Sequence, residues 1–270
     1  MSEFAVHVVR ASDEAQLTCF TGVRYGGSKH GLGLKANGIT GWSRRRMRHD
    51  STPRPFQHGT RVGRRLRDGQ KITLEAIAQE ASQYDFDRLA ETVLGFLAGG
   101  EACRIIVDKP GEESRWVDAV LDEVDVTPLH YKPRGDVLMS FVAPDAVRYG
   151  TERRVSIPVG GTVDLENRGT LAAWPQMYVT AAASTPNGYA VRLFTDTNPD
   201  LGYWRVQKSL SSPHLLDFKK AQVRVGGNPL WEATYGSSGP FQIPPGLTKM
   251  RLEYPGVGSA SAVITYADSY

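Results

Sequence analysis

Histidines, carboxylates and glycine-rich loops are where this chain could do chemistry, and their spacing argues against it. The histidines show no spacing that would place two metal ligands on one face of a helix or hairpin. They are His7, His30, His49, His58, His130 and His214. We interpret them as scattered surface histidines. The glycines from Gly22 to Gly33 precede no helix start that could hold a phosphate, and the sequence contains no nucleophile elbow, Walker loop or dinucleotide fingerprint. We therefore predict no metal, no cofactor and no catalytic residue.

Three carboxylates, Asp118, Asp122 and Asp125, are interspersed with valines in a stretch that has the pattern of an edge strand. Two carboxyl groups held roughly 5 to 9 Å apart could hydrolyse a glycosidic bond. A solvated strand face explains the same pattern without a substrate, and the sequence offers no convergent set of acid, base and nucleophile. The sequence therefore favours a protein that is not an enzyme.

Basic residues are concentrated in one segment. Residues 29–68 contain eleven lysines and arginines and only two aspartates, a net charge of +9. The whole chain is nearly balanced, with 32 basic and 29 acidic residues, so the excess is local. Guanidinium groups bind phosphate, but aromatic stacking partners are few in this segment. Arginine is also enriched at protein interfaces, and we favour an interface over nucleic acid.

The candidate interface residues are arginines of this basic segment and carboxylates of the acidic strand, which could pair between neighbouring subunits. They are Arg44, Arg45, Arg46, Arg48, Arg61, Arg64, Arg65, Arg67, Asp118, Asp122 and Asp125.

Aromatic residues of the second half could stack on sugars. Trp174, Trp204 and Trp231, with nearby tyrosines, are the candidate glycan contacts if they lie on a sandwich face. Such residues more often fill a core. Carbohydrate binding is therefore an alternative function and not the leading one.

The two cysteines and the first ten residues indicate the cellular compartment in which the chain folds. Cys19 and Cys103 lie in apolar contexts, which suits buried free thiols, although one disulfide between them is the alternative. The first ten residues lack the apolar core of a signal peptide, and no run approaches the roughly 20 apolar residues of a membrane span. We expect synthesis and folding in a cytoplasm, without membrane insertion.

The elements that must position these residues differ between the two halves of the chain. Strand patterns occupy 4–10, 15–20, 71–78, 102–108, 116–126 and 137–143. A helix is predicted from a cap at Asp85 to a stop at Gly99 and Gly100. Its apolar face consists of Phe86, Leu89, Val93, Phe96 and Leu97. Residues 22–69 contain ten glycines and two prolines, which predicts long loops or an extended basic arm rather than a packed layer.

Beyond Gly150 the sequence contains only short strand patterns separated by turn signals. They cover 154–159, 162–167, 175–182, 189–195, 215–218, 222–225, 229–234, 250–254 and 260–266. The clearest hairpin turn is Pro186-Asn-Gly188. Such a series is typical of a sandwich or jelly roll. We predict an α+β domain over 1–150, in which one helix packs on a β-sheet, and an all-β sandwich domain over 151–270.

The order of these elements resembles the distal tail proteins of long-tailed bacteriophages over essentially the whole chain. The resemblance is carried by the strand, helix and strand succession from Lys71 to Val107 and by the closing strand Val-Leu-Met-Ser-Phe-Val-Ala-Pro-Asp-Ala-Val-Arg-Tyr-Gly150. The family has an Asp-Pro-like passage where this chain has Pro144 and Asp145 in the reverse order. Val163-Asp-Leu-Glu-Asn-Arg-Gly-Thr170, followed by Trp174 and Pro175, resembles the opening of the family's C-terminal sandwich.

This resemblance implies a structural protein of the virion, located at the phage tail tip. Its N-terminal domain is expected to assemble into a homo-oligomeric, hexameric ring at the end of the tail tube, and its C-terminal domain to be a galectin-like β-sandwich. The implied partners are further copies of the chain, the tail tube protein, and the tail-tip hub and receptor-binding proteins. The genome would pass through the lumen of the ring, and a host glycan is the further partner that the alternative function requires.

Overall fold

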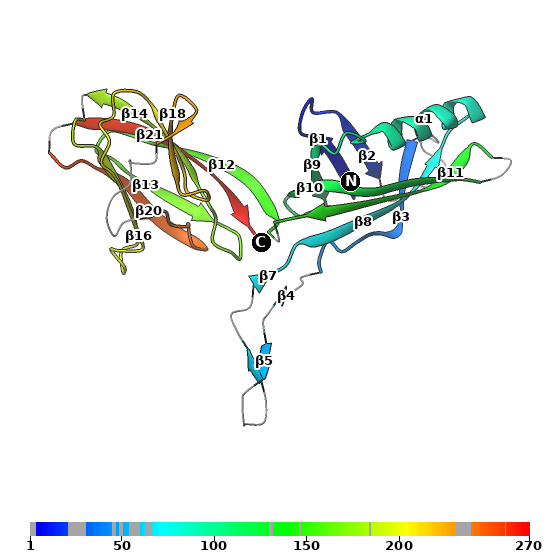
Figure 1. The fold of residues 1–270 in the computed structure, drawn as a ribbon, viewed down its shortest axis with the longest axis horizontal. Coiled ribbons are helices and arrows are strands. Elements are labelled where there is room, and N and C mark those ends of the chain that lie inside the picture. Colours follow the sequence, from blue (N-terminus) through cyan, green and yellow to red (C-terminus); the bar gives the residue numbers. More distant parts are fainter. Residues whose placement is uncertain are drawn as a thin grey trace. The chain divides into compact units, whose positions relative to one another are not determined.

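Strands form most of the described chain and only one helix occurs in it, so the predicted fold of β-sheets with one helix is confirmed at the level of a mostly β structure. The computed structural model describes residues 4–20, 31–44, 47–48, 51–53, 60–62, 66–129, 132–145, 147–183, 185–230, 239–256 and 258–270. The chain divides by its internal contacts into two units, Met1–Arg148 and Tyr149–Tyr270. Figure 1 shows both units along the chain.

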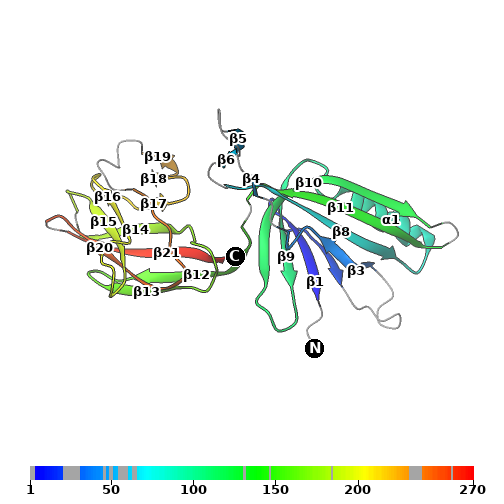
Figure 2. The same cartoon turned by 90° about the horizontal axis from the view of Figure 1, so that it is seen from below.

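In the first unit seven strands form a sheet that closes on itself. The strands are β1 (Ala5–Arg10), β2 (Gln16–Phe20), β3 (Gly31–Thr40), β8 (Gln70–Gln79), β9 (Ala102–Asp108), β10 (Arg115–Pro128) and β11 (Arg134–Ala143). Their order is β11-β8-β3-β2-β1-β9-β10, and β10 pairs back with β11. All neighbours are antiparallel except β2 and β3, which pair in parallel through two residue pairs. Figure 2 shows the long strands β3, β8, β11 and β10 side by side.

The interior of this closed sheet is filled by alternate residues of its strands and by the helix. In β8, for example, Ile72, Leu74, Ala76 and Ala78 are buried while the residues between them point outward. The helix α1 (Gln83–Gly95) packs on β8 and β10, and its Phe86 and Val93 join the same apolar core. Helix and strands therefore share one core.

The N-cap of the helix lies three residues before the predicted cap. Ser82 is the N-cap, because its hydroxyl accepts the backbone N–H of Asp85 at 3.1 Å and donates to the Asp85 carboxylate at 2.6 Å. The cap at Asp85 was therefore wrong, and Asp85 lies in the first turn, where its charge favours the helix dipole. The helix ends at Gly95, before the predicted Gly99-Gly100 stop, and Leu97 adopts a left-handed φ of 63°.

A β-bulge in β10 reverses which side chains point inward. Up to the bulge Val117, Ala119 and Leu121 face the core, and after it Val124 and Val126 do. The register with β11 shifts between Leu121 and Glu123, so Asp122 is the inserted residue. The acidic residues on both sides of the bulge consequently all point away from the core.

The basic segment is only partly an arm. Residues 31–40 form β3, whose Leu32 and Leu34 are buried, and Trp42 is buried as well. The prediction that 22–69 forms no packed layer is therefore wrong for this part. Apolar residues at alternate positions overrode the glycine signal. Four short strands follow and pair only with one another among the described residues. They are β4 (Met47–Arg48), β5 (Ser51–Pro53), β6 (Thr60–Val62) and β7 (Leu66–Arg67).

The second unit consists of two antiparallel sheets with a common core. One sheet contains β12 (Tyr149–Ile157), β21 (Ser259–Ser269), β14 (Gln176–Ala183), β17 (His214–Asp217), β18 (Gln222–Val225) and β19 (Asn228–Pro229) in that order. The other contains β13 (Thr162–Asn167), β20 (Gly246–Glu253), β15 (Tyr189–Phe194) and β16 (Gly202–Val206). Buried residues of both sheets form one cluster, the arrangement of a β-sandwich.

The turn at Pro186-Asn-Gly188 has a different role from the predicted hairpin. It connects β14 of one sheet to β15 of the other, so it crosses the sandwich instead of joining paired strands. Gly188 has φ +71°, and a Cβ there would lie 2.0 Å from the Val206 carbonyl oxygen. The turn therefore requires glycine for space as well as for conformation.

His214 lies in the core of the sandwich, so its interpretation as a surface histidine was wrong. Its ring is 1% exposed, and its Nδ1 lies 3.1 Å from the Tyr189 hydroxyl, which is also buried. Burial and the charge of Lys208 lower the pKa of His214 below its ordinary value. The residue is therefore held neutral in the folded protein.

Substitution of Gly135 by alanine is expected to destabilise the first unit. A Cβ at this position of β11 would lie 2.8 Å from the Phe86 ring of α1 and 2.8 Å from the Thr127 carbonyl oxygen. Because the helix and β10 would have to move, Gly135→Ala should lower the free energy of unfolding by about 2 kcal/mol in urea titrations. Gly95→Ala is the matched control, since nothing lies within 4 Å of a Cβ there. Equal stabilities of the two variants would contradict the close helix packing.

The neutral His214 predicts a loss of stability on the acidic side of neutrality. The unfolded chain takes up a proton near pH 6.5, whereas the folded chain does so only at lower pH, so stability falls as the pH drops below 6.5. In His214→Gln this contribution is absent. Urea titrations at pH 7 and pH 5 measure the free energy of unfolding of both proteins. The value for the wild type minus the value for the variant should be smaller at pH 5 than at pH 7. An unchanged difference would show that His214 is not held neutral.

Candidate assembly and binding surfaces

The arginines predicted to lie at a subunit interface are in the part of the chain where the structure describes the fewest residues. Arg44 is exposed. Arg48, Arg61 and Arg67 lie in β4, β6 and β7, whose backbone alone is described. The remaining candidates, Arg45, Arg46, Arg64 and Arg65, lie outside the described residues. Their role at an interface stays a prediction.

Hydrogen bonds connect the residues that flank the arginine-rich residues 44–67. The side-chain amide of Gln70 donates to the carbonyl oxygens of Gly41 and Trp42, which lie on the other side of the arginine-rich residues 44–67; the bond to Trp42 is 2.8 Å long. Gly41 has φ +81°, and a Cβ there would lie 2.0 Å from the Lys71 carbonyl oxygen. Arg148 covers the Trp42 ring at 5.8 Å. The start of the segment is therefore fixed to the closed sheet.

The acidic candidates of β10 already have partners within the chain. Asp118 accepts from the guanidinium of Arg104 at 2.9 Å, and the same guanidinium stacks on Trp116 at 3.6 Å. Asp122 pairs with Lys71 at 2.8 Å, and this contact raises the pKa of the lysine. Asp125 accepts from the Thr127 hydroxyl at 2.8 Å. The exposed ion pairs of Asp118 and Asp122 each add little stability.

The glycan candidates are not brought together. The prediction that Trp204 contacts a glycan was wrong, because Trp204 is 1% exposed. It packs edge-on against Phe218, with ring centroids 4.7 Å apart. Trp174 is 37% exposed. Trp231 lies outside the described residues. Exposed Tyr203 lies under the guanidinium of Arg192 at 5.0 Å, so one face of its ring is covered.

Hydrogen bonds connect Thr18, His7 and Asp108, on β2, β1 and β9, in the order of the nucleophile, base and acid of a catalytic triad. His7 Nδ1 lies 2.9 Å from the Thr18 hydroxyl, and His7 Nε2 lies 3.0 Å from the Asp108 carboxylate. The Gln16 amide nitrogen is closer still to His7 Nδ1, at 2.6 Å, and donates to the same threonine hydroxyl at 2.7 Å. Gln16 therefore competes with Thr18 for the imidazole nitrogen that a catalytic base would need. The group connects three strands by hydrogen bonds.

Other chemistry finds little support in the described residues. No group of three or more His, Cys, Asp or Glu side chains in the described ranges could hold a metal ion. Cys103 is a buried free thiol, as predicted, and burial raises its pKa to about 12, so it is a poor nucleophile. The side chain of Cys19 lies outside the described residues. Within the described ranges no helix has the length and apolarity to span a membrane.

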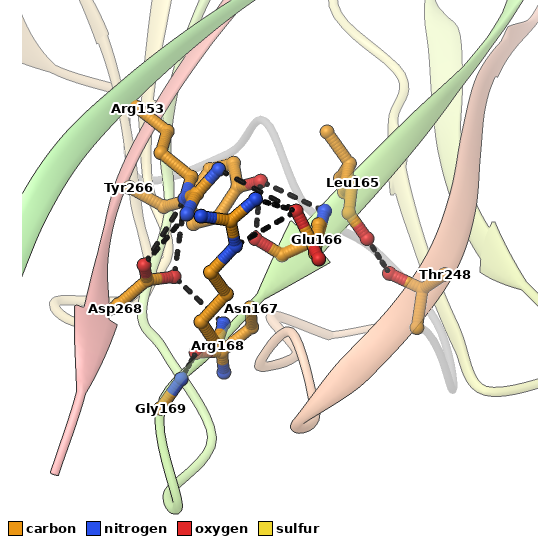
Figure 3. A network of polar contacts seen from close by, with 9 residues as sticks. All are labelled: Arg153, Leu165, Glu166, Asn167, Arg168, Gly169, Thr248, Tyr266 and Asp268. Carbon is orange, nitrogen blue, oxygen red and sulfur yellow. Dashed lines mark hydrogen bonds and ion pairs between the residues drawn. The ribbon is translucent and has the colours of Figure 1, made fainter.

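One polar network of the second unit was missed by the sequence analysis. Asp268 on β21 is completely buried, and Arg153 on β12 binds its carboxylate through Nε and a terminal nitrogen at 3.0 to 3.2 Å. The backbone N–H of Arg168 donates to the same carboxylate at 2.9 Å. Figure 3 shows these residues converging from β12, β21 and the end of β13. The hydrogen bonds to Asp268 raise the pKa of Arg153, so the guanidinium stays charged.

Tyr266 joins the same network from the next inward position of β21. Its hydroxyl accepts from the Glu166 N–H at 3.0 Å and donates to the Glu166 carbonyl at 3.1 Å, which anchors the end of β13 (Figure 3). Burial raises the pKa of this tyrosine. The signal in the sequence was an isolated acidic residue at an inward position of a strand, which needs a buried cation.

The Asn-x-Gly motif that carried the family resemblance forms the adjoining turn. The Asn167 amide donates to the carbonyl oxygens of Leu171 and Ile243 and accepts the Gly169 N–H at 3.0 Å. A Cβ on Gly169 would lie 2.0 Å from the Ser269 carbonyl oxygen. Both residues of the motif are therefore required by geometry, since asparagine satisfies buried backbone groups and glycine permits close approach of β21.

Removal of Arg153 is expected to destabilise the sandwich strongly. In Arg153→Ala the buried Asp268 carboxylate loses its cation, and the free energy of unfolding should fall by about 3 kcal/mol. Arg154, the exposed next residue of β12, supplies the control: Arg154→Ala should change stability by less than about 0.5 kcal/mol. Urea unfolding of the full chain measures both. Similar losses for the two variants would contradict the dependence of the sandwich on the buried pair.

Comparison with known proteins finds a similarity of fold and no match in sequence. No model of a protein family matches the chain. No curated protein sequence matches it either. The crystal structure of the SPP1 Dit (gp 19.1) protein, described as a paradigm of the hub adsorption apparatus in Gram-positive-infecting phages, is similar with a TM-score of 0.70. The identity is 14%, and the match covers 98% of this chain and 99% of that one.

Two phage P2 baseplate structures in the activated conformation, with Ca and with Sr, match at TM-scores of 0.48 and 0.49. Their identities are 9% and 8%, and the matches cover 97% of this chain and 98% and 97% of those chains. Likeness at this level carries no further argument. From end to end, the chain has the fold of the SPP1 Dit protein, which confirms the predicted resemblance to distal tail proteins at the level of the fold.

Proposed function

We propose that this protein is a structural component of a bacteriophage tail tip, where copies of it form a ring that joins the tail tube to the hub and receptor-binding proteins. The observation that carries this proposal is the full-length similarity to the SPP1 Dit protein. A match over both units favours a shared role more than a match to a sandwich alone would, because sandwiches serve many functions.

The division of the chain is consistent with this role. The unit boundary at Arg148 lies within two residues of the end of the proposed ring-forming domain, 1–150. The proposed second domain, 151–270, contains two stacked sheets, as a galectin-like sandwich would. The closed sheet and its helix share one core, and this gives a ring subunit a rigid body.

We propose further that the ring is a hexamer that encloses a lumen for the genome. It is located in the virion, and its chains are made in a bacterial cytoplasm. A ring requires two different patches on each subunit that fit one another. The basic segment and the acidic strand β10 are two such patches of opposite charge. The proposed function requires no catalytic step.

Carbohydrate binding, the alternative function, gains no observation in its favour. Trp204 fills the core, and one face of the exposed Tyr203 is covered by Arg192. We therefore do not advance it as a second function.

Negative-stain imaging and mass photometry of the purified full chain test the proposal. We expect closed rings with a central hole and a mass of about six subunits. Because the proposed contacts are partly ionic, the fraction of rings should fall as the salt concentration rises. A chain that remains monomeric at micromolar concentration in low salt would overturn the proposed function.

A further inference from the structure

Two of the asparagines in this chain are followed by glycine, a dipeptide that can modify itself without an enzyme. The backbone nitrogen of the glycine attacks the side-chain amide carbon of the asparagine, a succinimide ring forms, and ammonia leaves. Water then opens the ring to aspartate or isoaspartate. Glycine favours this approach because it has no side chain to obstruct it. The two sites are Asn37-Gly38 and Asn187-Gly188.

The three other asparagines are unsuited to this reaction. Asn198 and Asn228 precede prolines, whose nitrogen carries no hydrogen to lose when the ring forms. Asn167 is 1% exposed, and its side chain makes the three hydrogen bonds of the turn at Gly169. Its amide carbon is therefore fixed, since moving it would leave buried backbone groups unpaired.

Asn37 has a suitable neighbour but lies within a paired strand. It belongs to β3, which pairs with β8 on both sides of it. Gly38 is buried, and a Cβ on it would lie 2.3 Å from the Glu75 carbonyl oxygen and 2.8 Å from the backbone of Lys35. The peptide unit that has to rotate is thus enclosed by other backbone, and it is released only when the strand opens.

The second site lies in a turn whose hydrogen bond is weak. The Gly188 N–H, which would attack, donates to the Thr185 carbonyl at 3.3 Å. That distance is beyond the usual range of such bonds, and the same carbonyl also accepts the Leu210 N–H at 3.2 Å. The close contact of Gly188 with Val206 concerns its Cα and not this nitrogen. Asn187 is exposed, so solvent base and water reach the site.

This exposure is a property of the second unit itself. The unit begins at Tyr149, which pairs with Ser269 at one end of β21. At the other end of β21, Ser259 pairs with Ala183, shortly before the turn. The eleven residues of β21 separate these two ends by about 33 Å. Asn187 therefore lies at the end of the sandwich opposite to Tyr149.

The side chain of Asn187 connects two loops at this end. Its amide nitrogen donates to the Pro255 carbonyl at 3.2 Å, so the turn between β14 and β15 is tied to the loop that precedes β21. A carboxylate at this position has no hydrogen to donate and would bring two acceptor oxygens together. The bond is therefore lost when the amide becomes a carboxylate.

We propose that Asn187 is a site of spontaneous deamidation, and that its product releases the loop before β21 from the β14–β15 turn. The Gly188 nitrogen gives its proton to solvent base and bonds to the Asn187 amide carbon, while the amide nitrogen takes up a proton and leaves as ammonia. Water then opens one of the two carbon–nitrogen bonds of the ring. The isoaspartate product also adds one atom to the backbone of the turn. This inference goes beyond the proposed function and does not depend on it.

Mass spectrometry of tryptic peptides tests the inference on the folded full chain, kept at neutral pH and sampled over several weeks. The peptide with Asn187 should convert to aspartate and isoaspartate forms about tenfold or more faster than the peptide with Asn37, because a turn opens more often than a paired strand. In guanidinium chloride, where neither site is folded, the two peptides should react at similar rates. Equal rates in the folded chain would overturn the inference, and so would a reaction of Asn187 in denaturant only.

Hydrogen exchange tests the consequence with a variant that reproduces one product. In Asn187→Asp the amides of Gly256 and Ala260, which bond to Tyr254, should exchange about fivefold faster than in the wild type, because the tie to Pro255 is gone. The amides of β13 serve as the reference and should not change. Circular dichroism establishes that the variant is folded. Unchanged exchange at Gly256 and Ala260 would contradict the release of the loop.

Discussion

The pairing of β10 with two different strands is the constraint on which the first unit depends. Its early residues pair with β9 and its late residues with β11, so one strand closes a seven-stranded sheet. Closure leaves an interior that β-strand side chains and the helix fill together. The change of partner coincides with a bulge at Asp122, and the bulge exchanges the inward and outward positions. Without it, Val124 and Val126 would face water and the acids between them the core. The same residue insertion thus serves the core and produces an acidic outer face.

Much of the local structure could be predicted from the sequence, because local patterns decide it. Alternating apolar residues located β8, β9 and β11, and apolar spacing of three and four located α1. Failures came where a distant partner decides the outcome. The glycines of residues 31–40 indicated a loop, but pairing with β8 makes this stretch a strand, and a Cβ on Gly38 would lie 2.3 Å from the Glu75 carbonyl oxygen. The missed strand β16 and the interior position of His214 likewise depend on residues far away in the sequence.

The candidate surfaces were less predictable than the fold, because charge and aromaticity do not reveal on which side of a strand a residue lies. Trp204 and Trp174 are the same type of residue, yet Trp204 fills the core and Trp174 is partly exposed. In contrast, the motif around Asn167 and Gly169 could be recognised because it is fixed by close backbone contacts. A residue held by geometry tolerates few replacements, whereas core residues exchange among apolar types of similar volume. This explains how one fold can be shared with the SPP1 Dit protein at 14% identity.

Opposite charges in one sequence do not by themselves say whether they meet within a chain or between chains. Here the structure divides the acids of β10 into two classes. Asp118 and Asp122 lie beside the ladder with β9 or at the bulge, within reach of Arg104 and Lys71, and are neutralised inside the chain. Glu123 and Asp125 lie beyond the end of the ladder with β9 and form no ion pair among the described residues, although the charge of Glu123 contributes to the raised pKa of Lys71. Local cations thus accompany the part of β10 that pairs with β9, whereas the acids of the part that continues past β9 form no ion pair among the described residues.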